Sequence, residues 1–463
     1  MNRFILPVVF FFVFLLPLPV LPAEPASTGD SSSYRLTLDD AVRLGLEKSR
    51  SLEIARLDRQ MASAKIRETW SEVLPQITSG FTYTRSLKPS VLFFPNVFSD
   101  PPNLNSFTPL EISADNSASA TLDLRQKIFD GAAIAGIRAA SVVRKMSDEA
   151  YRNTESAVVA DIKQSYFDAL ISRDRLKLIR QSIERWELAQ KDTRAMFRQG
   201  IAADIDTLQA FLSVENLRPD LIQAENMVGI SMTRLKNAMG ISADSEVTLT
   251  GKLEVPPASY PGDIASAYRE ALQSRPDLRQ LELQVSAEDE KVFAARAERF
   301  PVLSAFGQLE TQSAFNDDVS LSDSNWPVSS AVGLQLSLPI FTGFRISARV
   351  EQAKISRLQV MTRYADLKAS IRTDVEVRLS AFREAQKRIA VQSKTISVAE
   401  RSYRISQLRF REGIGSRLEL SDAELQLNRA KTNYLQAVYD YMTASVLLDR
   451  ALGRSAVAVA AGR

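Results

Sequence analysis

The chain of 463 residues contains no cysteine and no histidine. Without cysteine it has no disulfide, no thiolate metal ligand and no attachment point for a bacterial lipid anchor at a mature amino terminus. Without histidine it forms no Ser-His-Asp triad, no Cys-His dyad and no imidazole metal site. A pair of carboxylates of the glycosidase type stays chemically possible, but nothing in the sequence localises such a pair. The sequence therefore gives no support for an enzyme, a metal site or a cofactor.

Nucleotide-binding motifs and excess charge are also missing. The chain has no Walker-type glycine loop and no GxGxxG motif. Apart from residues 1–23, whose only charge is Arg3, it has 57 basic and 55 acidic residues. A net charge this close to zero gives no argument for binding nucleic acid.

Long apolar runs are confined to the amino terminus. An apolar run over residues 4–20 follows Arg3, contains three prolines and leads to Leu21-Pro22-Ala23. This pattern predicts a signal peptide over 1–23, cleaved after Ala23, with a membrane anchor as the alternative. No later segment offers 18 consecutive apolar residues. If the exported chain enters a membrane, we therefore expect it to do so as a β-barrel.

The rest of the sequence consists of an internal repeat of two copies. Residues 38–81 align with 264–307 without a gap at a shift of 226, and residues 151–240 align with 364–453 at a shift of 213. Phe197-Arg198-Gln199-Gly200-Ile201, for example, recurs as Phe410-Arg411-Glu412-Gly413-Ile414. We therefore divide the chain into a first repeat, 24–240, and a second repeat, 241–463. The change of shift predicts about 13 extra residues in the first copy, and the proline-rich segment 88–105 is expected to be a loop tip.

Long helices and short strands alternate in each repeat. The absence of proline and near-absence of glycine predict helices over 131–198 and 343–411, each roughly 68 residues and about 100 Å long. Shorter helices are expected over 38–73, 204–240, 262–299 and 417–452, with kinks at Pro219 and Pro276. Period-two alternation predicts strands at about 75–86, 117–129, 301–312 and 329–341, each with one apolar face. Four strands are too few to close a membrane barrel, so either the sheet is soluble or several chains share one barrel.

The order helix, hairpin, long helix, turn and helix, repeated once, resembles the TolC-like family of outer membrane efflux proteins. The residues that carry the resemblance are the two Arg-x-Gly-Ile turns followed by acids, and Leu338-Pro339-Ile340-Phe341-Thr342-Gly343 after the fourth strand. The resemblance implies a mainly α fold with a small β part. It further implies a homotrimer whose twelve strands form one barrel in outer membrane lipid and whose helices form a periplasmic tunnel. The implied partners are a periplasmic adaptor and an inner-membrane pump.

The resemblance also implies roles for residues near the two helix turns. Arg198, Gly200, Arg411 and Gly413 would lie at the periplasmic tip, where the adaptor binds, although glycine at a helix end also has a purely structural use. Glu419 and Asp422 match acids that ring the tunnel entrance, and Asp206 matches an acid that holds it closed. They are also ordinary solvated acids for the first turns of a helix.

The closing contact itself departs from the family pattern. Phe410 and Gly415 stand where that contact would have a tyrosine and an arginine, which leaves Arg417 as a possible substitute partner for Asp206.

Three functions compete on the sequence alone. The first is a passive outer-membrane exit channel of a tripartite efflux pump or a type I secretion system. The second is a periplasmic adaptor, but its helical hairpin would occur once and interrupt β-domains. The third is a coiled-coil scaffold without a pore.

Overall fold

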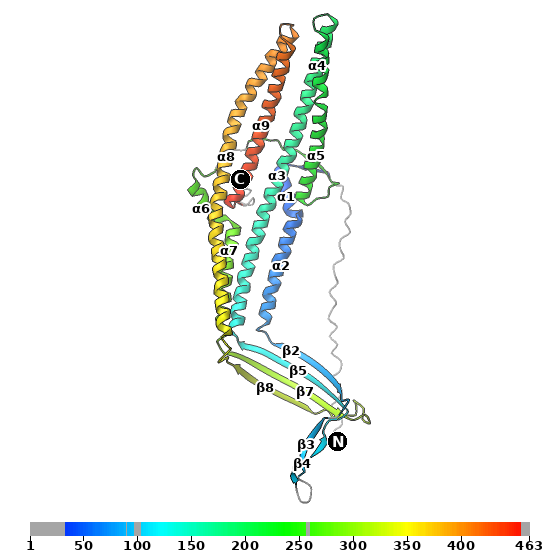
Figure 1. Ribbon diagram of the computed structural model, residues 1–463, viewed down its shortest axis with the longest axis vertical. Helices are drawn as coiled ribbons and strands as arrows, with labels where there is room; N and C mark the ends of the chain where they lie inside the picture. The colour runs from blue at the N-terminus through cyan, green and yellow to red at the C-terminus, as the bar shows by residue number, and fades with distance from the viewer. Residues whose placement is uncertain (1–32, 89, 97–102, 256–259, 455–463) are drawn as a thin grey trace.

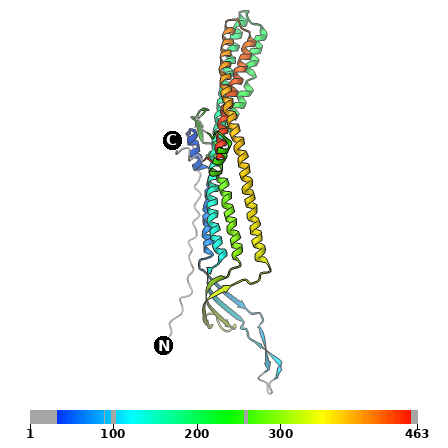
Figure 2. The same ribbon diagram turned by 90° about the vertical axis from the view of Figure 1, so that its left-hand side faces the viewer.

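The computed structural model describes residues 33–88, 90–96, 103–255 and 260–454. The molecule is a long rod of near-parallel helices that ends in a curved sheet, with two helix turns at the opposite end (Figures 1 and 2). The segment expected to be a signal peptide, 1–23, lies outside the described residues. Among the described residues, no helix is both long and apolar enough to cross a membrane.

Two long helices and seven shorter ones make up the described part of the rod. In the first half they are α1 (Leu38–Lys48), α2 (Arg50–Ser71), α3 (Gly131–Arg198), α4 (Asp204–Glu215) and α5 (Arg218–Met239). In the second half they are α6 (Ile264–Ser274), α7 (Pro276–Ala297), α8 (Arg345–Arg411) and α9 (Arg417–Leu452). α3 covers the range expected from the sequence. α8 begins two residues later than expected, because Gly343 and Phe344 both have left-handed backbone angles, with φ of 58° and 62°.

The helices form a single curved layer. α3 lies at its centre and packs against α2 and α7 near the sheet, and against α5, α4 and α9 towards the tips. α8 lies at one margin, beside α7 and α9, while α2, α4 and α5 lie at the other (Figure 1). The helices therefore form a curved layer with two lateral margins that no other helix of the layer covers.

The main sheet continues the helical layer at one end of the rod. Its strands β2 (Gln76–Arg85), β5 (Asn116–Phe129), β7 (Val302–Phe315) and β8 (Val328–Ser337) pair antiparallel in the order β2-β5-β7-β8. The register aligns Ile77, Leu124, Gly307 and Val332 in one row across the sheet, and Thr78, Asp123, Gln308 and Ala331 in the next. Because adjacent rows point to opposite faces, one face is mainly apolar and the other mainly polar. β2 and β8 are the two unpaired edges.

The two shorter helical stretches that precede strands, 38–73 and 262–299, are each interrupted about a third of the way along. The expected single helix 38–73 divides at Ser49, and the expected helix 262–299 divides at Arg275, the position equivalent by the shift of 226. Only the second break was expected, at Pro276, which occupies the first helical position of α7. The expected kink at Pro219 is a full interruption at Asn216 and Leu217, just upstream of that proline.

Both breaks are held by a glycine from the end of the same half. Gly240 and Gly453, which are equivalent by the shift of 213, end α5 and α9 with φ of 75° and 74°. A Cβ on Gly240 would lie 2.2 Å from the carbonyl oxygen of Lys48, and one on Gly453 would lie 2.7 Å from the backbone nitrogen of Arg275. Glycine is thus required at both places for its backbone angles and for its lack of a side chain.

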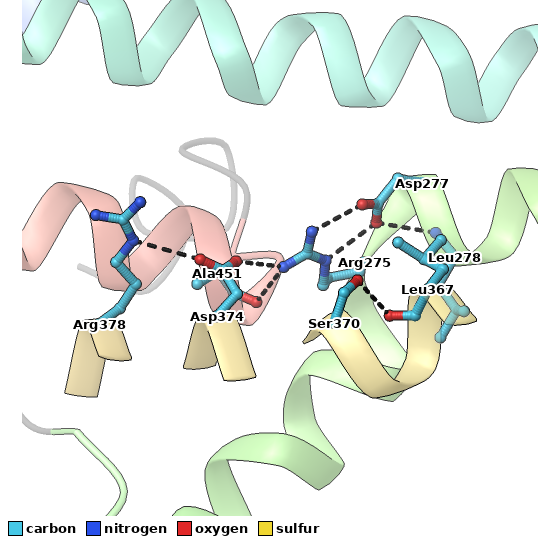
Figure 3. A network of polar contacts seen from close by, with 8 residues as sticks. All are labelled: Arg275, Asp277, Leu278, Leu367, Ser370, Asp374, Arg378 and Ala451. Carbon is cyan, nitrogen blue, oxygen red and sulfur yellow. Dashed lines mark hydrogen bonds and ion pairs between the residues drawn. The ribbon is translucent and has the colours of Figure 1, made fainter. Parts of the chain in front are cut away.

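Ion pairs and hydrogen bonds of Arg275 also stabilise the second break (Figure 3). The guanidinium of Arg275 donates to Asp277 at 2.8 Å, to Asp374 on α8 at 2.9 Å and to the carbonyl of Ala451 on α9 at 3.3 Å. Its first-half equivalent is Ser49, which has no comparable ion pairs among the described contacts. The main apolar core lies in the same middle zone, where α1, α3, α6, α8 and α9 meet.

Two strand pairs were missed from the sequence. β1 (Ser33–Leu36) and β6 (Glu246–Leu249) form a small parallel sheet beside the middle of the rod. The segment 88–105, expected to be a loop tip, contributes instead to a hairpin of β3 (Val91–Asn96) and β4 (Asn103–Glu111) that extends beyond the main sheet (Figure 1). The prolines argued against strands there, but Pro95 sits where the register shifts and both strands are edges, which is where strands tolerate proline.

Candidate functional site at the helix tips

The first tip is the turn between α3 and α4. The α3 helix ends in a left-handed residue, Gly200, with φ of 76°, and the amide of Ile201 donates back to the carbonyl of Met196 at 2.9 Å. A Cβ on Gly200 would meet nothing within 4 Å. Glycine is therefore favoured here by backbone geometry alone. Ile201 and Ile205 are exposed on this turn.

The second tip, between α8 and α9, is tighter. Gly413 has φ of 71°, and the amides of Ile414 and Gly415 both donate to the carbonyl of Arg409, at 3.0 and 2.9 Å. A Cβ on Gly415 would lie 2.9 Å from the Cβ of Arg409 and 3.0 Å from the amide nitrogen of Phe410. The turn closes onto the end of α8 and leaves no room for a side chain at 415. The arginine that the family pattern has at this place would not fit this backbone.

The expected closing contact is therefore absent in its usual form. Phe410 is buried and carries no hydroxyl. The Asp206 carboxylate instead accepts a hydrogen bond from the amide of Ala203 at 3.1 Å, at the start of α4.

Arg417 connects the two tips within one chain. Its Nη2 donates to the hydroxyl of Ser213 on α4 at 3.2 Å. Burial lowers the pKa of Arg417, and the negative charge of Asp206 opposes that shift. The structure thus brings Asp206 and Arg417 within electrostatic range, although the described contacts contain no direct ion pair between them.

Glu419 and Asp422 lie in the first two turns of α9. Ser416 caps this helix by accepting from the amide of Glu419 at 3.1 Å. The Glu419 carboxylate lies 3.8 Å from the Arg409 guanidinium, and both Glu419 and Asp422 are exposed. Their separation of three residues puts them on one side of the helix. Each remains accessible to ions from outside the chain.

The arginines of the two Arg-x-Gly-Ile turns differ in their contacts. Arg411 lies 3.6 Å from the carboxylate of Asp192 and so links the end of α8 to α3. Arg198 is exposed at the end of α3. Within the described ranges, no group of three or more acidic side chains is placed to hold a metal ion.

A buried charge cluster close behind the second tip was missed from the sequence. Glu424 on α9 is only 2% exposed, and its two carboxylate oxygens accept from Nε of Arg185 on α3 at 2.8 and 3.0 Å. Ser182 and Asn428 donate to the same carboxylate, each at 3.2 Å. Burial raises the pKa of Glu424, while Arg185 opposes the shift.

The repeat contained a signal for this cluster. At the shift of 213, Arg185 corresponds to Val398 and Glu424 corresponds to Phe211. Each charged residue thus stands where the other copy has an apolar residue. The two substitutions are complementary in charge, and they lie on helices from different halves.

Comparisons with known proteins extend this description to the whole chain. Residues 41–241 and 267–454 match the family described as outer membrane efflux protein. The chain belongs to that family. It is an outer membrane efflux protein, which agrees with the first of the three functions expected from the sequence, the outer-membrane exit channel.

Relatives of this protein align over most of their length at low identity. It is 23% identical over 421 residues to the "Probable efflux pump outer membrane protein TtgC" of Pseudomonas putida, covering 90% of this chain and 82% of the relative. It is 22% identical over 446 residues to the "Outer membrane protein TolC" of Escherichia coli, covering 94% and 86%.

Solved structures show the same fold. The CmeC outer membrane channel of Campylobacter jejuni superimposes with a TM-score of 0.73 at 19% identity, covering 90% of this chain and 85% of that one. A structure of CusC gives a TM-score of 0.72 at 20% identity, covering 91% and 93%. The expected TolC-like fold is confirmed.

Proposed function

We propose that three copies of this outer membrane efflux protein close into one channel, with a twelve-stranded barrel in the outer membrane and a helical tunnel across the periplasm. The observation that carries the proposal is the open sheet. β2 and β8 are unpaired edges, and unpaired backbone groups are unsatisfied in hydrocarbon. Pairing β8 of each copy with β2 of the next removes all edges, and places the mainly apolar face of the sheet towards lipid.

The helical margins support the same closure. On the α8 margin, the exposed apolar residues near the tips recur at intervals of seven, which is the period of a coiled-coil contact; they are Val391, Val398 and Ile405. On the opposite margin, α4 exposes Ile205, Leu208 and Leu212 at helical spacing. Near the sheet, α8 exposes Ile355 and Leu358, and α2 exposes Ile54, Leu57 and Met61. Each margin thus has an apolar counterpart at the same level on the other.

The channel acts as a passive exit duct within a larger pump. Several relatives are named as outer membrane proteins of efflux pumps, which supports a periplasmic adaptor and an inner-membrane pump as partners here. The exposed residues of the two tips, Ile201, Ile414 and Leu418, form an apolar end surface for the adaptor. Arg198, Gly200, Arg411 and Gly413 would shape that surface. We assign no catalytic activity to the chain.

Glu419 and Asp422 supply the electrostatics of the entrance. Three copies would place six carboxylates around a narrow opening, which attracts cations and can bind a multivalent one. Asp206 and Arg417 would help to set how far the two tips separate.

Single-channel conductance in planar bilayers tests the proposal. We expect a discrete conductance that trivalent cations block from the tip side. Glu419→Gln with Asp422→Asn should weaken the block, whereas Asp366→Asn with Glu376→Gln, the same charge change far from the tips on α8, should not. A purified protein that inserts but never conducts would contradict the channel. Equal block in both variants would contradict only the assignment of the acids.

A further inference from the structure

The β3–β4 ribbon is mainly apolar on both faces. Cross-strand partners share a face, so the register places Val91, Phe93, Pro95, Phe107, Pro109 and Glu111 on one face and Leu92, Phe94, Thr108 and Leu110 on the other. All of these side chains except that of Pro95 are exposed, and Phe93 is 65% exposed. Among residues 91–95 and 107–111 the one charged residue is Glu111, at the base of the ribbon.

A ribbon of this kind is not stable in water by itself. Two strands without a packed face are marginal at best. The main sheet does not extend over it, because β3 and β4 pair only with each other. Both faces therefore need a covering surface.

Lipid does not satisfy this requirement. β3 and β4 each have one outer edge with unpaired backbone amides and carbonyls, and hydrocarbon offers no partners for them. A ribbon lying on a membrane surface, or bound to one face of another protein, would cover one face and leave the other in water. A second copy of the ribbon on each side covers both faces and leaves the edges free to contact water.

We propose that the three ribbons of the trimer pack face to face in a closed ring at the end opposite the helix tips, where they narrow the outer mouth of the channel. The inference rests on the proposed trimer. Among the described residues such a ribbon occurs only in the first half of the chain, between β2 and β5, and it extends away from the main sheet (Figure 2). Because β2 is an edge of that sheet, each copy in the trimer would place one ribbon beside a seam between copies. In a threefold ring the Phe93 face of one ribbon meets the Phe94 face of the next, which makes the contact heterologous.

Cysteine cross-linking tests this arrangement directly, because the chain has no cysteine of its own. The purified full-length protein would carry Phe93→Cys, Phe94→Cys, or both, and would be treated with a short bismaleimide. The double variant should yield a covalently closed trimer on denaturing gels. Each single variant should stay monomeric, because its thiol faces a surface without one. The matched control is Ala331→Cys with Val332→Cys, neighbouring positions on opposite faces of β8, which should give no covalent trimer.

The outcomes separate the ring from the trimer. Native mass spectrometry of every variant reports whether the particle is trimeric. Trimeric particles without covalent trimers from the double variant would overturn the ring and leave the channel proposal standing. Monomeric particles would overturn both. Dimers from the single variants would show that like faces meet, which overturns the heterologous ring. Quenching of a dye on Phe93→Cys by a lipid-borne quencher would show that lipid covers the ribbon instead.

Discussion

Removing Arg185 should destabilise the second tip in a strongly pH-dependent way. The Arg185→Leu variant loses the guanidinium that bonds both oxygens of Glu424, and Glu424 is too buried for water to replace it. The carboxyl will then take up a proton rather than stay charged. Protonating a carboxyl of ordinary pKa 4.5 at pH 7 costs about 3.4 kcal/mol, because each pH unit is worth about 1.36 kcal/mol. At pH 5 the same cost is about 0.7 kcal/mol.

The direction of this pH dependence follows from comparing the folded and unfolded states of the variant. In the variant, the folded-state pKa of Glu424 lies above its unfolded value, so the folded state holds a proton that the unfolded state releases. The cost of protonating Glu424 is therefore absent below about pH 4.5 and grows as pH rises. Burial already raises the pKa of Glu424 in the wild type, so these figures are upper limits for the difference.

Amide hydrogen exchange over Leu420–Asn428 measures this local opening. Corrected for intrinsic rates, the variant should exchange up to about 300-fold faster than wild type at pH 7 and about 3-fold faster at pH 5. Arg185→Leu combined with Glu424→Leu removes both charges and should show a small ratio that does not vary with pH. A ratio for the single variant that stays constant from pH 5 to pH 7 would refute the reasoning.

Three further predictions concern stability, measured as urea unfolding of the detergent-solubilised protein by circular dichroism. Gly453→Ala should lower the free energy of unfolding by about 3 kcal/mol or more, because the added Cβ meets backbone atoms and the residue must keep a left-handed φ. Gly200→Ala should lower it by only about 1 kcal/mol, since only the left-handed φ is unfavourable there. Equal losses would contradict the close approach at Gly453. Arg275→Lys should not restore the stability lost in Arg275→Ala, since one ammonium does not reproduce the paired bonds of the guanidinium; full rescue would show that charge alone matters. Burial and a hydrogen bond to Asp168 raise the pKa of Tyr439 to about 12, so the free energy of unfolding should fall as pH rises from about 10 to 12. Tyr439→Phe should reduce this dependence on pH. An unchanged dependence would show that another group causes it.

The long elements were predictable because their signals are local. α3 and α9 have the bounds expected from proline and glycine placement, and the four main strands lie within a few residues of the alternating segments. The break at Ser49 carries no such signal. It depends on Gly240, which lies far away in the sequence and approaches the break only in the folded chain.

The positions of the candidate tip residues were predictable, but their contacts were not. The glycine turns and the acids after them lie at the tips, yet the space around Gly415 and the orientation of Arg417 depend on how α8 and α9 meet. The cluster of Arg185 and Glu424 joins residues from different halves. Only a residue-by-residue comparison of the two copies, which exposes Val398 and Phe211 as apolar equivalents, could have indicated it.

The central claim, that three chains complete one channel, is tested most directly by the mass of the purified particle. Native mass spectrometry of the purified protein, released from detergent at low collision energy, should give three times the mass that the same preparation gives for one chain under denaturing conditions. The same preparation should conduct in planar bilayers. A stable monomer that conducts would contradict the account, because a single chain leaves the edges of β2 and β8 open.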